Sequence, residues 1–203
     1  MSTERIQKAR KNFPFTPPNL FRYAKTVIIF GMIAAASGSN FAFARGVTPE
    51  MLYGREKDLQ TRIIIQIFLK SNHIRSLDDY AHWLSKNIRY KTDEYGDQWA
   101  RPEETLRNGF GDCEDIAFLN QAVLLALGYQ PHVVAFARQG YAHAFCIFKL
   151  DRVYAVFDNT HFVITRTGSL NEIVNFVHTQ ENAKLFMELS LNPSEVKMFY
   201  FRT

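Results

Sequence analysis

The sequence predicts an α+β fold in which helices come first and an antiparallel sheet follows. Apolar residues recur at three- and four-residue steps in two segments, 77–84 and 116–127, and at two-residue steps from residue 132 onward. Helical segments followed by a run of strands are typical of α+β architectures, in which helices pack on an antiparallel sheet. The 203 residues, 47% of them hydrophobic and 14% aromatic, suffice for one domain with its own core.

Two helix starts lie in the first half of the chain. Pro49 follows a threonine that can serve as N-cap, which predicts a helix that begins there and extends to Lys70. Ser76 and Asp79 have the spacing of a reciprocal capping pair, which predicts a second helix that ends near Asn87.

A polar segment and a strongly apolar helix come next. From Tyr90 to Arg107 the composition predicts a long loop with a short helical turn at 102–106. The helix after it begins at about Cys113, and Gly128 stands where a glycine commonly ends a helix. Its apolar residues recur at helical spacing: Ile116, Leu119, Val123 and Leu127.

Three candidate strands with two-residue alternation follow and are joined by short turns, which predicts an antiparallel meander. They are His132 to Arg138, Ala142 to Lys149 and Arg152 to Phe157. Ser169 and Glu172 form a capping-box pattern, which predicts a last helix that extends to about Leu189. Residues 196–201 are a candidate final strand.

The positive charge of the chain is concentrated in its first 44 residues. They contain six Lys/Arg and one acid, which leaves 18 basic and 19 acidic residues (24 − 6 and 20 − 1) from residue 45 onward. The remainder therefore has a net charge of 18 − 19 = −1. The sequence pI of 9.1 thus gives no support for a nucleic-acid partner.

The first 44 residues have the layout of an export signal. A basic region ends at Lys25, an apolar run covers Thr26 to Ala36, and Ala42 to Ala44 fit an A-x-A cleavage site. A retained membrane anchor is the alternative, but the apolar run has 11 residues, and a spanning helix needs roughly 20. We therefore predict a signal peptide over 1–44 and a periplasmic or secreted domain over 45–203.

A cysteine, a histidine and an aspartate have the chain order of one known arrangement for nucleophilic catalysis. Cys113 lies at the predicted first turn of a helix, where backbone N–H groups stabilise a thiolate and an oxyanion. His143 in a strand can deprotonate the thiol and protonate the leaving group, and Asp158 can orient the imidazole. Asp158 could instead be a turn residue, and Asn159 is then the substitute.

The second cysteine has an expected structural role. Side chains alternate along a strand, so Cys146 faces the side opposite to His143. If His143 faces Cys113, Cys146 points away from Cys113. We therefore predict that Cys146 is a small buried apolar residue and that it forms no disulfide with Cys113.

From about residue 88 to 159 the chain resembles the bacterial transglutaminase-like cysteine peptidases, within the transglutaminase-like and papain-like superfamily. The matching residues, in order, are Trp99, Pro102-Glu103-Glu104, Gly109 to Asp115, Gly128, Ala142-His143 and Asp158-Asn159. The resemblance implies a papain-like core with the nucleophile helix packed on an antiparallel sheet. It also implies a triad of Cys113, His143 and Asp158, with Trp99 as a wall of the acyl pocket or an N–H donor to the oxyanion. Tyr141, two residues before His143, is a candidate substrate contact.

Calcium is also implied by the resemblance, because acidic residues that flank the nucleophile bind it in adhesin-releasing members. Asp112 and Glu114 match those positions. Independently, Asp112, Glu114 and Asp115 crowd negative charge around Cys113, and a hard divalent cation would offset it. The alternative is that these acids cap the helix and complement its dipole without a metal.

The expected function is hydrolysis of an amide bond through a Cys thioester, by an exported cysteine peptidase or amidase that needs no cofactor for this chemistry. Two alternatives remain: transfer of the acyl group to an amine, as in a transglutaminase, and a catalytically silent protein-binding domain. The resemblance implies a protein or peptide substrate such as a cell-surface protein, and a membrane-bound regulator.

Overall fold

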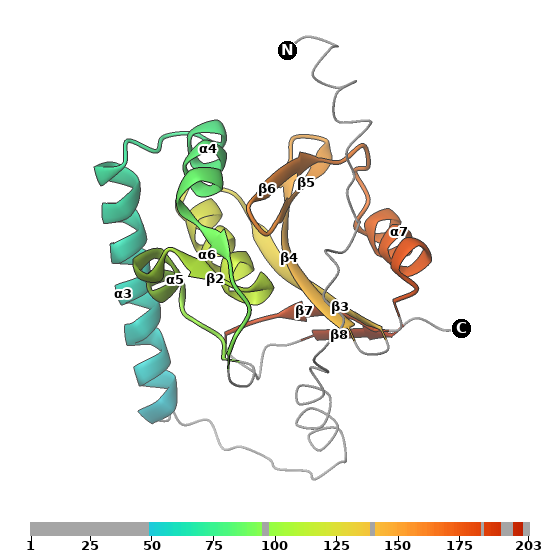
Figure 1. Ribbon diagram of the computed structural model, residues 1–203, viewed down its shortest axis with the longest axis horizontal. Coiled ribbons are helices and arrows are strands. Elements are labelled where there is room, and N and C mark those ends of the chain that lie inside the picture. Colours follow the sequence, from blue (N-terminus) through green and yellow to red (C-terminus); the bar gives the residue numbers. More distant parts are fainter. Residues whose placement is uncertain (1–48, 95–97, 139–140, 184, 192–196, 201–203) are drawn as a thin grey trace.

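An antiparallel sheet with helices on both faces forms the centre of the molecule (Figure 1). This computed structural model describes residues 49–94, 98–138, 141–183, 185–191 and 197–200, with backbone only for 49–57 and 197–200. The predicted signal peptide over 1–44 lies outside the described residues. Across the described part, no helix combines the length and apolar composition that crossing a membrane requires.

The α+β prediction is confirmed. Within the described residues, four helices precede the main sheet: α3 (Pro49–Ser71), α4 (Leu77–Asn87), α5 (Pro102–Asn108) and α6 (Cys113–Ala126). The strands that follow are β3 (Pro131–Arg138), β4 (Tyr141–Leu150), β5 (Val153–Asp158), β6 (His161–Ile164), β7 (Leu185–Leu189) and β8 (Lys197–Tyr200). Helix α7 (Leu170–Glu181) comes between β6 and β7. The strand order is β6-β5-β4-β3-β7-β8, and every neighbouring pair is antiparallel.

The helix starts follow the predicted local chemistry. The Ser76 side chain accepts a hydrogen bond from the Asp79 amide over 3.1 Å, and the Asp79 carboxylate accepts one from the Ser76 amide over 3.0 Å. This reciprocal pair satisfies two amides that have no partner within the helix. Gly128 closes α6 with a φ of 91°, which favours glycine at that position.

Four features differ from the prediction, and the last two concern the final helix. A short parallel pair, β1 (Arg89–Tyr90) with β2 (Phe110–Gly111), closes the polar loop onto the start of α6. A two-residue turn after Asp158 leads into β6, a strand that was not predicted.

The last helix is the third difference, because it ends eight residues before the predicted Leu189. Asn182 adopts a left-handed conformation with a φ of 49° and ends α7. The residues after it form β7 and pair with β3. Phe186 packs into one core cluster, whereas Met187 and Leu189 pack into the other. Burial on both faces of the sheet thus overrides the helical pattern. The predicted capping box is also wrong, because the Ser169 side chain makes no cap hydrogen bond.

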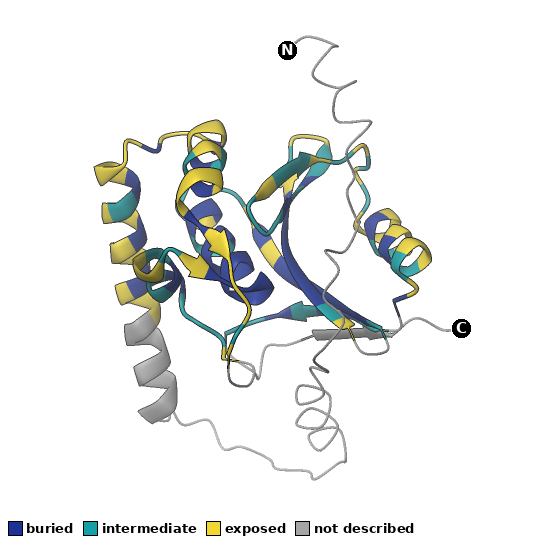
Figure 2. Cartoon of the chain, viewed as in Figure 1, coloured by how far each residue is buried: buried dark blue, intermediate teal, exposed yellow. Residues whose placement is uncertain are grey.

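Alternation along β4 divides the core into two clusters. Ala144, Cys146 and Phe148 pack with buried residues of α6 on one face. Phe145 and Ile147 pack with α7 on the other face. Figure 1 shows α3 to α6 on the first side of the sheet and α7 on the second. In Figure 2, α6 and β4 show long buried stretches.

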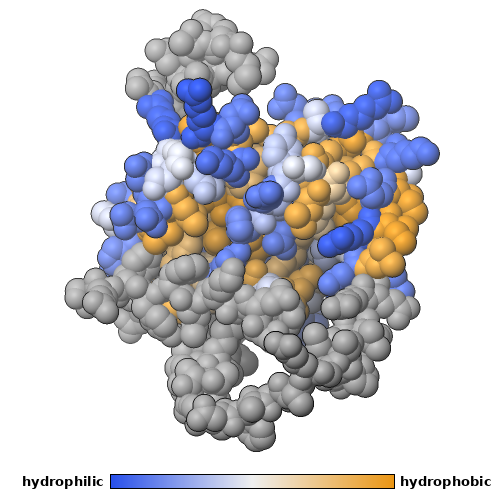
Figure 3. Space-filling view, turned by 180° about the vertical axis from the view of Figure 1, so that it is seen from behind, coloured by the Kyte–Doolittle hydropathy of each residue, from blue (hydrophilic) through white to orange (hydrophobic). Residues whose placement is uncertain are grey.

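The outer face of α3 is apolar in part. Figure 3 shows apolar side chains gathered along the edge where α3 lies. The helix leaves four large apolar side chains exposed: Leu59, Ile63, Ile64 and Ile67.

Candidate active site

Cys113 is the first residue of α6 and has only 5% of its surface exposed. The turn before it is held by Asp115, whose carboxylate accepts hydrogen bonds from the amides of Ala100 (2.7 Å) and Asp112 (3.3 Å). Gly111 is needed for this arrangement, because a Cβ at that position would lie 2.6 Å from the Cβ of Asp115. The Gly-Asp-Cys-Glu-Asp segment therefore builds a tight turn that fixes the cysteine at a helix N-terminus.

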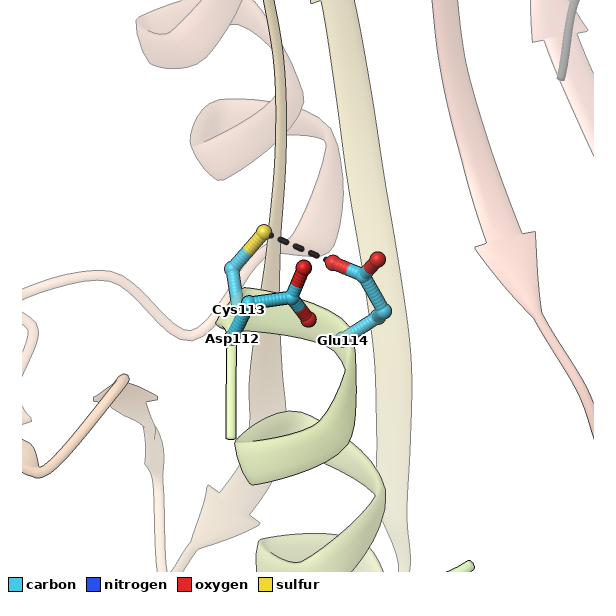
Figure 4. Close-up of side chains that lie close together, drawn as sticks. All are labelled: Asp112, Cys113 and Glu114. Carbon is cyan, nitrogen blue, oxygen red and sulfur yellow. Dashed lines mark hydrogen bonds between the residues drawn. The ribbon is translucent and has the colours of Figure 1, made fainter. Parts of the chain in front are cut away.

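The Cys113 thiol is hydrogen-bonded within its own segment. Its Sγ lies 2.9 Å from Oε2 of Glu114, and the thiol donates to that carboxylate. Figure 4 shows Asp112, Cys113 and Glu114 gathered at the start of α6. Asp112 and Glu114 are both buried. Two carboxylates thus lie beside the thiol in a site with little access to water.

These carboxylates fit a hard divalent cation. One ligand atom each from Asp112, Cys113 and Glu114 lies within 4.8 Å of the others. Calcium takes oxygen ligands at about 2.4 Å, so two ligands of one ion lie at most about 4.8 Å apart. Asp112 and Glu114 supply the oxygen atoms that calcium prefers, whereas both oxygens of Asp115 already accept backbone hydrogen bonds.

The titration of Asp115 is altered at this turn. Burial raises its pKa from 3.8 to about 6. The hydrogen bond from the Ala100 amide opposes the rise, and the negative charge of Asp112 adds to it.

His143 and Asp158 are in direct contact. His143 Nε2 lies 2.7 Å from Oδ1 of Asp158, and the histidine is 9% exposed. His143 belongs to β4, and Asp158 is the last residue of the neighbouring strand β5. Because a carboxylate only accepts, Nε2 carries a proton in this bond and Nδ1 is the nitrogen left for another partner. The pairing therefore selects one tautomer of the imidazole.

Tyr141 lies beside this pair. Its ring stacks on that of His143 with centroids 6.3 Å apart. Burial and, to a smaller extent, the neighbouring Cys113 and Asp158 raise the pKa of the Tyr141 phenol to about 12. The phenol thus lies within electrostatic reach of both groups. The predicted substrate contact is 39% exposed, so part of its surface remains open to a ligand.

The second cysteine is buried and free, as predicted. Cys146 is fully buried and forms no disulfide with Cys113. However, Cys146 lies in the same core cluster as Cys113, on the face of the sheet that α6 covers. The His143 ring lies near Phe136 of the second cluster, with centroids 5.9 Å apart, and the contacts of His143 among the described residues include Asp158 but not Cys113. Alternation along the strand was predicted correctly, whereas the face chosen by the helix depends on packing between distant segments.

Trp99 lies beside the turn that carries the cysteine. It is half-buried and packs on Phe118 with ring centroids 5.5 Å apart. It also lines a cleft of about 440 Å³ together with Gly111 and Asp115, which lie on either side of Cys113 in sequence. Trp99 therefore lines a cleft next to the turn that carries Cys113.

Two polar residues of the core were not singled out by the sequence. Asn120 of α6 and Tyr80 of α4 are both fully buried and are joined by a hydrogen bond of 2.6 Å. Asn120 also donates to the backbone oxygen of Asn159, the residue after Asp158. A single Asn within an apolar helix carries no pattern that would reveal such partners.

Solved structures with similarity to this chain include LapG of Legionella pneumophila. The calcium-bound form is 17% identical, with 72% of this chain and 81% of that chain covered and a TM-score of 0.44. The EGTA-treated form is 15% identical, with 70% and 89% covered and a TM-score of 0.42. A structure from Cytophaga hutchinsonii, provisionally assigned as a cysteine protease, is 16% identical, with 71% and 53% covered and a TM-score of 0.41. Comparison with curated proteins finds no match.

A family model described as a transglutaminase-like domain matches residues 60–186, which is more than half of the chain. The match begins within α3 and ends within β7, so it includes Cys113, His143 and Asp158. This chain belongs to the transglutaminase-like domain family.

Proposed function

We propose that this chain is a cysteine peptidase or amidase that hydrolyses an amide bond through a thioester on Cys113. The observation that carries the proposal is the contact of 2.7 Å between His143 Nε2 and Asp158, which leaves Nδ1 of the same ring for a thiol. Membership of the transglutaminase-like family supports it. So does the place of Cys113 at the first position of α6, where backbone N–H groups favour a thiolate.

The proposed reaction has two halves. Nδ1 of His143 takes the thiol proton, and the thiolate of Cys113 attacks the carbonyl carbon of the scissile amide. The C–N bond breaks when the imidazolium gives its proton to the leaving nitrogen, which leaves a thioester and a free amine. Water then attacks the thioester with His143 as base, and the thiolate leaves and is reprotonated. Asp158 holds the imidazole in the required tautomer throughout.

The developing oxyanion needs donors beside Cys113. Backbone N–H groups at the start of α6 are the proposed donors, because the first N–H groups of a helix have no partner within it. We assign Trp99 to the wall of the acyl pocket or to an N–H donor for the oxyanion, since it lines the cleft beside the nucleophile turn. Tyr141, which is stacked on His143 and partly exposed, is the proposed substrate contact.

We assign a calcium site to Asp112 and Glu114. Both carboxylates are buried beside the thiol, and their spacing fits one ion. A bound calcium ion would neutralise negative charge next to the thiolate. This support comes from the residues of this chain, whereas the calcium in the LapG structure is a property of LapG.

The proposed substrate is a protein or peptide of the cell surface, and the proposed location is the periplasm or the medium outside a bacterial cell. The export layout of residues 1–44 supports the location. A membrane-bound regulator is proposed on the resemblance alone. Transfer of the acyl group to an amine is the second candidate reaction, because it uses the same thioester.

The deciding experiment is the alkylation of Cys113 by iodoacetamide as a function of pH, in the wild-type chain and in His143→Ala. Burial raises the pKa of the Cys146 thiol far above its usual range, so labelling of the folded chain reports on Cys113. We expect a wild-type rate that is already high at about pH 6 and falls in the variant. A rate that rises only at about pH 8.5 in both proteins is that of an ordinary thiol and contradicts the proposal.

A further inference from the structure

A continuous chain of hydrogen bonds crosses the core from α4 to the turn that carries Asp158. The Tyr80 hydroxyl lies 2.6 Å from Oδ1 of Asn120, and Nδ2 of Asn120 lies 3.0 Å from the backbone oxygen of Asn159. Asn159 follows Asp158 directly in the sequence. Tyr80 and Asn120 are completely buried. These hydrogen bonds therefore link three segments that are far apart in sequence.

The direction of each bond in this chain is determined. The backbone oxygen of Asn159 can only accept, so Asn120 must turn its NH₂ group toward it. The amide oxygen of Asn120 then faces Tyr80, whose hydroxyl must donate. Burial raises the pKa of the Tyr80 phenol well above its usual value, which keeps that proton in place. The amide of Asn120 is thus held in one orientation.

Asn120 and Cys113 belong to the same face of α6. They are seven residues apart, which is close to two full helical turns, or about 10 Å along the axis. One end of this face carries the Cys113 thiol, and at the other end Asn120 donates a hydrogen bond to the turn after β5. Tyr80 reinforces the link, since its ring packs on Phe157 with centroids 5.5 Å apart. Phe157 immediately precedes Asp158.

The turn itself needs support. Asn159 adopts a left-handed backbone conformation with a φ of 51°, which costs energy for any residue other than glycine. Its side-chain Nδ2 lies 3.5 Å from the same Oδ1 of Asp158 that contacts His143. A shift of this turn would therefore move the carboxylate on which the imidazole depends.

We propose that Asn120 is a positioning residue, which fixes the helix that carries Cys113 relative to the turn that carries Asp158. The proposal rests on the proposed function, because it assumes that His143 activates the thiol. Asn120 touches neither the substrate nor the reacting atoms. It sets the register between the nucleophile and the His143–Asp158 pair, and Tyr80 holds it in the orientation that does so.

The test is a double-mutant cycle on the full chain, with the rate of iodoacetamide alkylation of Cys113 at pH 7 as the readout. The four proteins are the wild type, Asn120→Leu, His143→Ala and the double variant. We expect Asn120→Leu to lower the rate about tenfold in the wild-type background, because small displacements of a reacting group are costly. We expect less than about a twofold effect in the His143→Ala background, because the effect acts through the imidazole.

Two further variants separate positioning from general destabilisation. Val123→Ala removes buried volume from the same helix and takes no part in the chain of hydrogen bonds. It should lower the melting temperature and leave the alkylation rate unchanged. Tyr80→Phe releases the amide of Asn120 and should lower the rate by a smaller factor, which provides the test if Asn120→Leu does not fold.

The outcomes distinguish the two proposals. Equal rates in the wild type and His143→Ala contradict the proposed function and the positioning role with it. A rate that depends on His143 but not on Asn120 or Tyr80 overturns the positioning role alone. The same conclusion follows if Val123→Ala lowers the rate as much as Asn120→Leu, or if Asn120→Leu is equally harmful in both backgrounds.

Discussion

His143 and Asp158 are joined through Nε2 and Oδ1 over 2.7 Å, from neighbouring strands at one end of the hairpin. The bond orients the ring and leaves Nδ1 as the nitrogen that can serve a thiol. It also places a negative charge where an imidazolium would form. Because of these two effects, removal of Asp158 should lower the reactivity of the Cys113 thiol.

Asp158→Ala should lower the alkylation rate of Cys113 at pH 7 by roughly 10- to 100-fold, because the imidazole loses its orientation and its counter-charge. Asp158→Asn should lower it less, since the amide keeps a hydrogen-bonding group in place. Asp78→Ala, at an exposed carboxylate of α4, is the control and should leave the rate unchanged. Equal rates for all three variants would remove Asp158 from the site.

The two cysteines should respond oppositely to substitution. Cys113→Ala should abolish alkylation and turnover while changing the stability by about 1 kcal/mol or less, because a single hydrogen bond to Glu114 is lost. Cys146→Ala should keep both activities and lower the stability by about 1 kcal/mol or more, because it leaves a small cavity in the core. Denaturant unfolding and labelling with a mass tag measure both effects. Loss of folding in Cys113→Ala contradicts a functional role for the thiol.

Gly111→Ala should disturb the turn that carries Cys113. The added Cβ would lie 2.6 Å from the Cβ of Asp115, so the carboxylate must leave its backbone hydrogen bonds. We expect a loss of stability of about 1 to 3 kcal/mol and a slower alkylation of Cys113. Gly128→Ala is the matched control, because a Cβ there meets no atom within 4 Å but the φ is 91°. It should lower stability through backbone strain alone and leave the alkylation rate unchanged.

Asp115 should make the stability depend on pH in the direction opposite to most carboxylates. Burial raises its pKa from 3.8 to about 6 in the folded chain, so the folded state holds the proton more tightly. Its contribution to stability is complete below about pH 3.8 and is lost as the pH rises through about 6. Measured without metal, the stability of the wild type relative to Asp115→Asn should therefore fall between these values and stay constant above them. A difference that rises with pH would contradict the shift.

Removal of calcium should slow the alkylation of Cys113, because uncompensated charge on Asp112 and Glu114 disfavours the thiolate. The measurement compares the rate in a chelator with the rate after calcium is restored. Glu114→Gln should weaken this response, since it removes one charged ligand and one acceptor for the thiol proton. An unchanged rate in the chelator supports the alternative, in which the acids only cap the helix and complement its dipole.

Local patterns in the sequence were sufficient for most of the secondary structure. The Ser76–Asp79 pair, the start of α6 at Cys113 and the meander of β3 to β5 follow from caps, short turns and periodicity that are visible within a few residues. The candidate residues Cys113, His143 and Asp158 could be named from residue type and order, because each step of the chemistry requires one kind of side chain.

Contacts between distant segments decided what the sequence left open. The segment after Asn182 has a helical pattern, but pairing with β3 makes it a strand with both faces buried. The face of β4 that α6 covers could not be read from alternation, which fixes two faces but does not say which one a helix will bury. The link from Asn120 to Asn159 also arises only when α6 packs on the sheet. The sequence by itself determined the candidate groups and their elements, whereas tertiary packing decided their relative positions, because these depend on side chains brought together by folding.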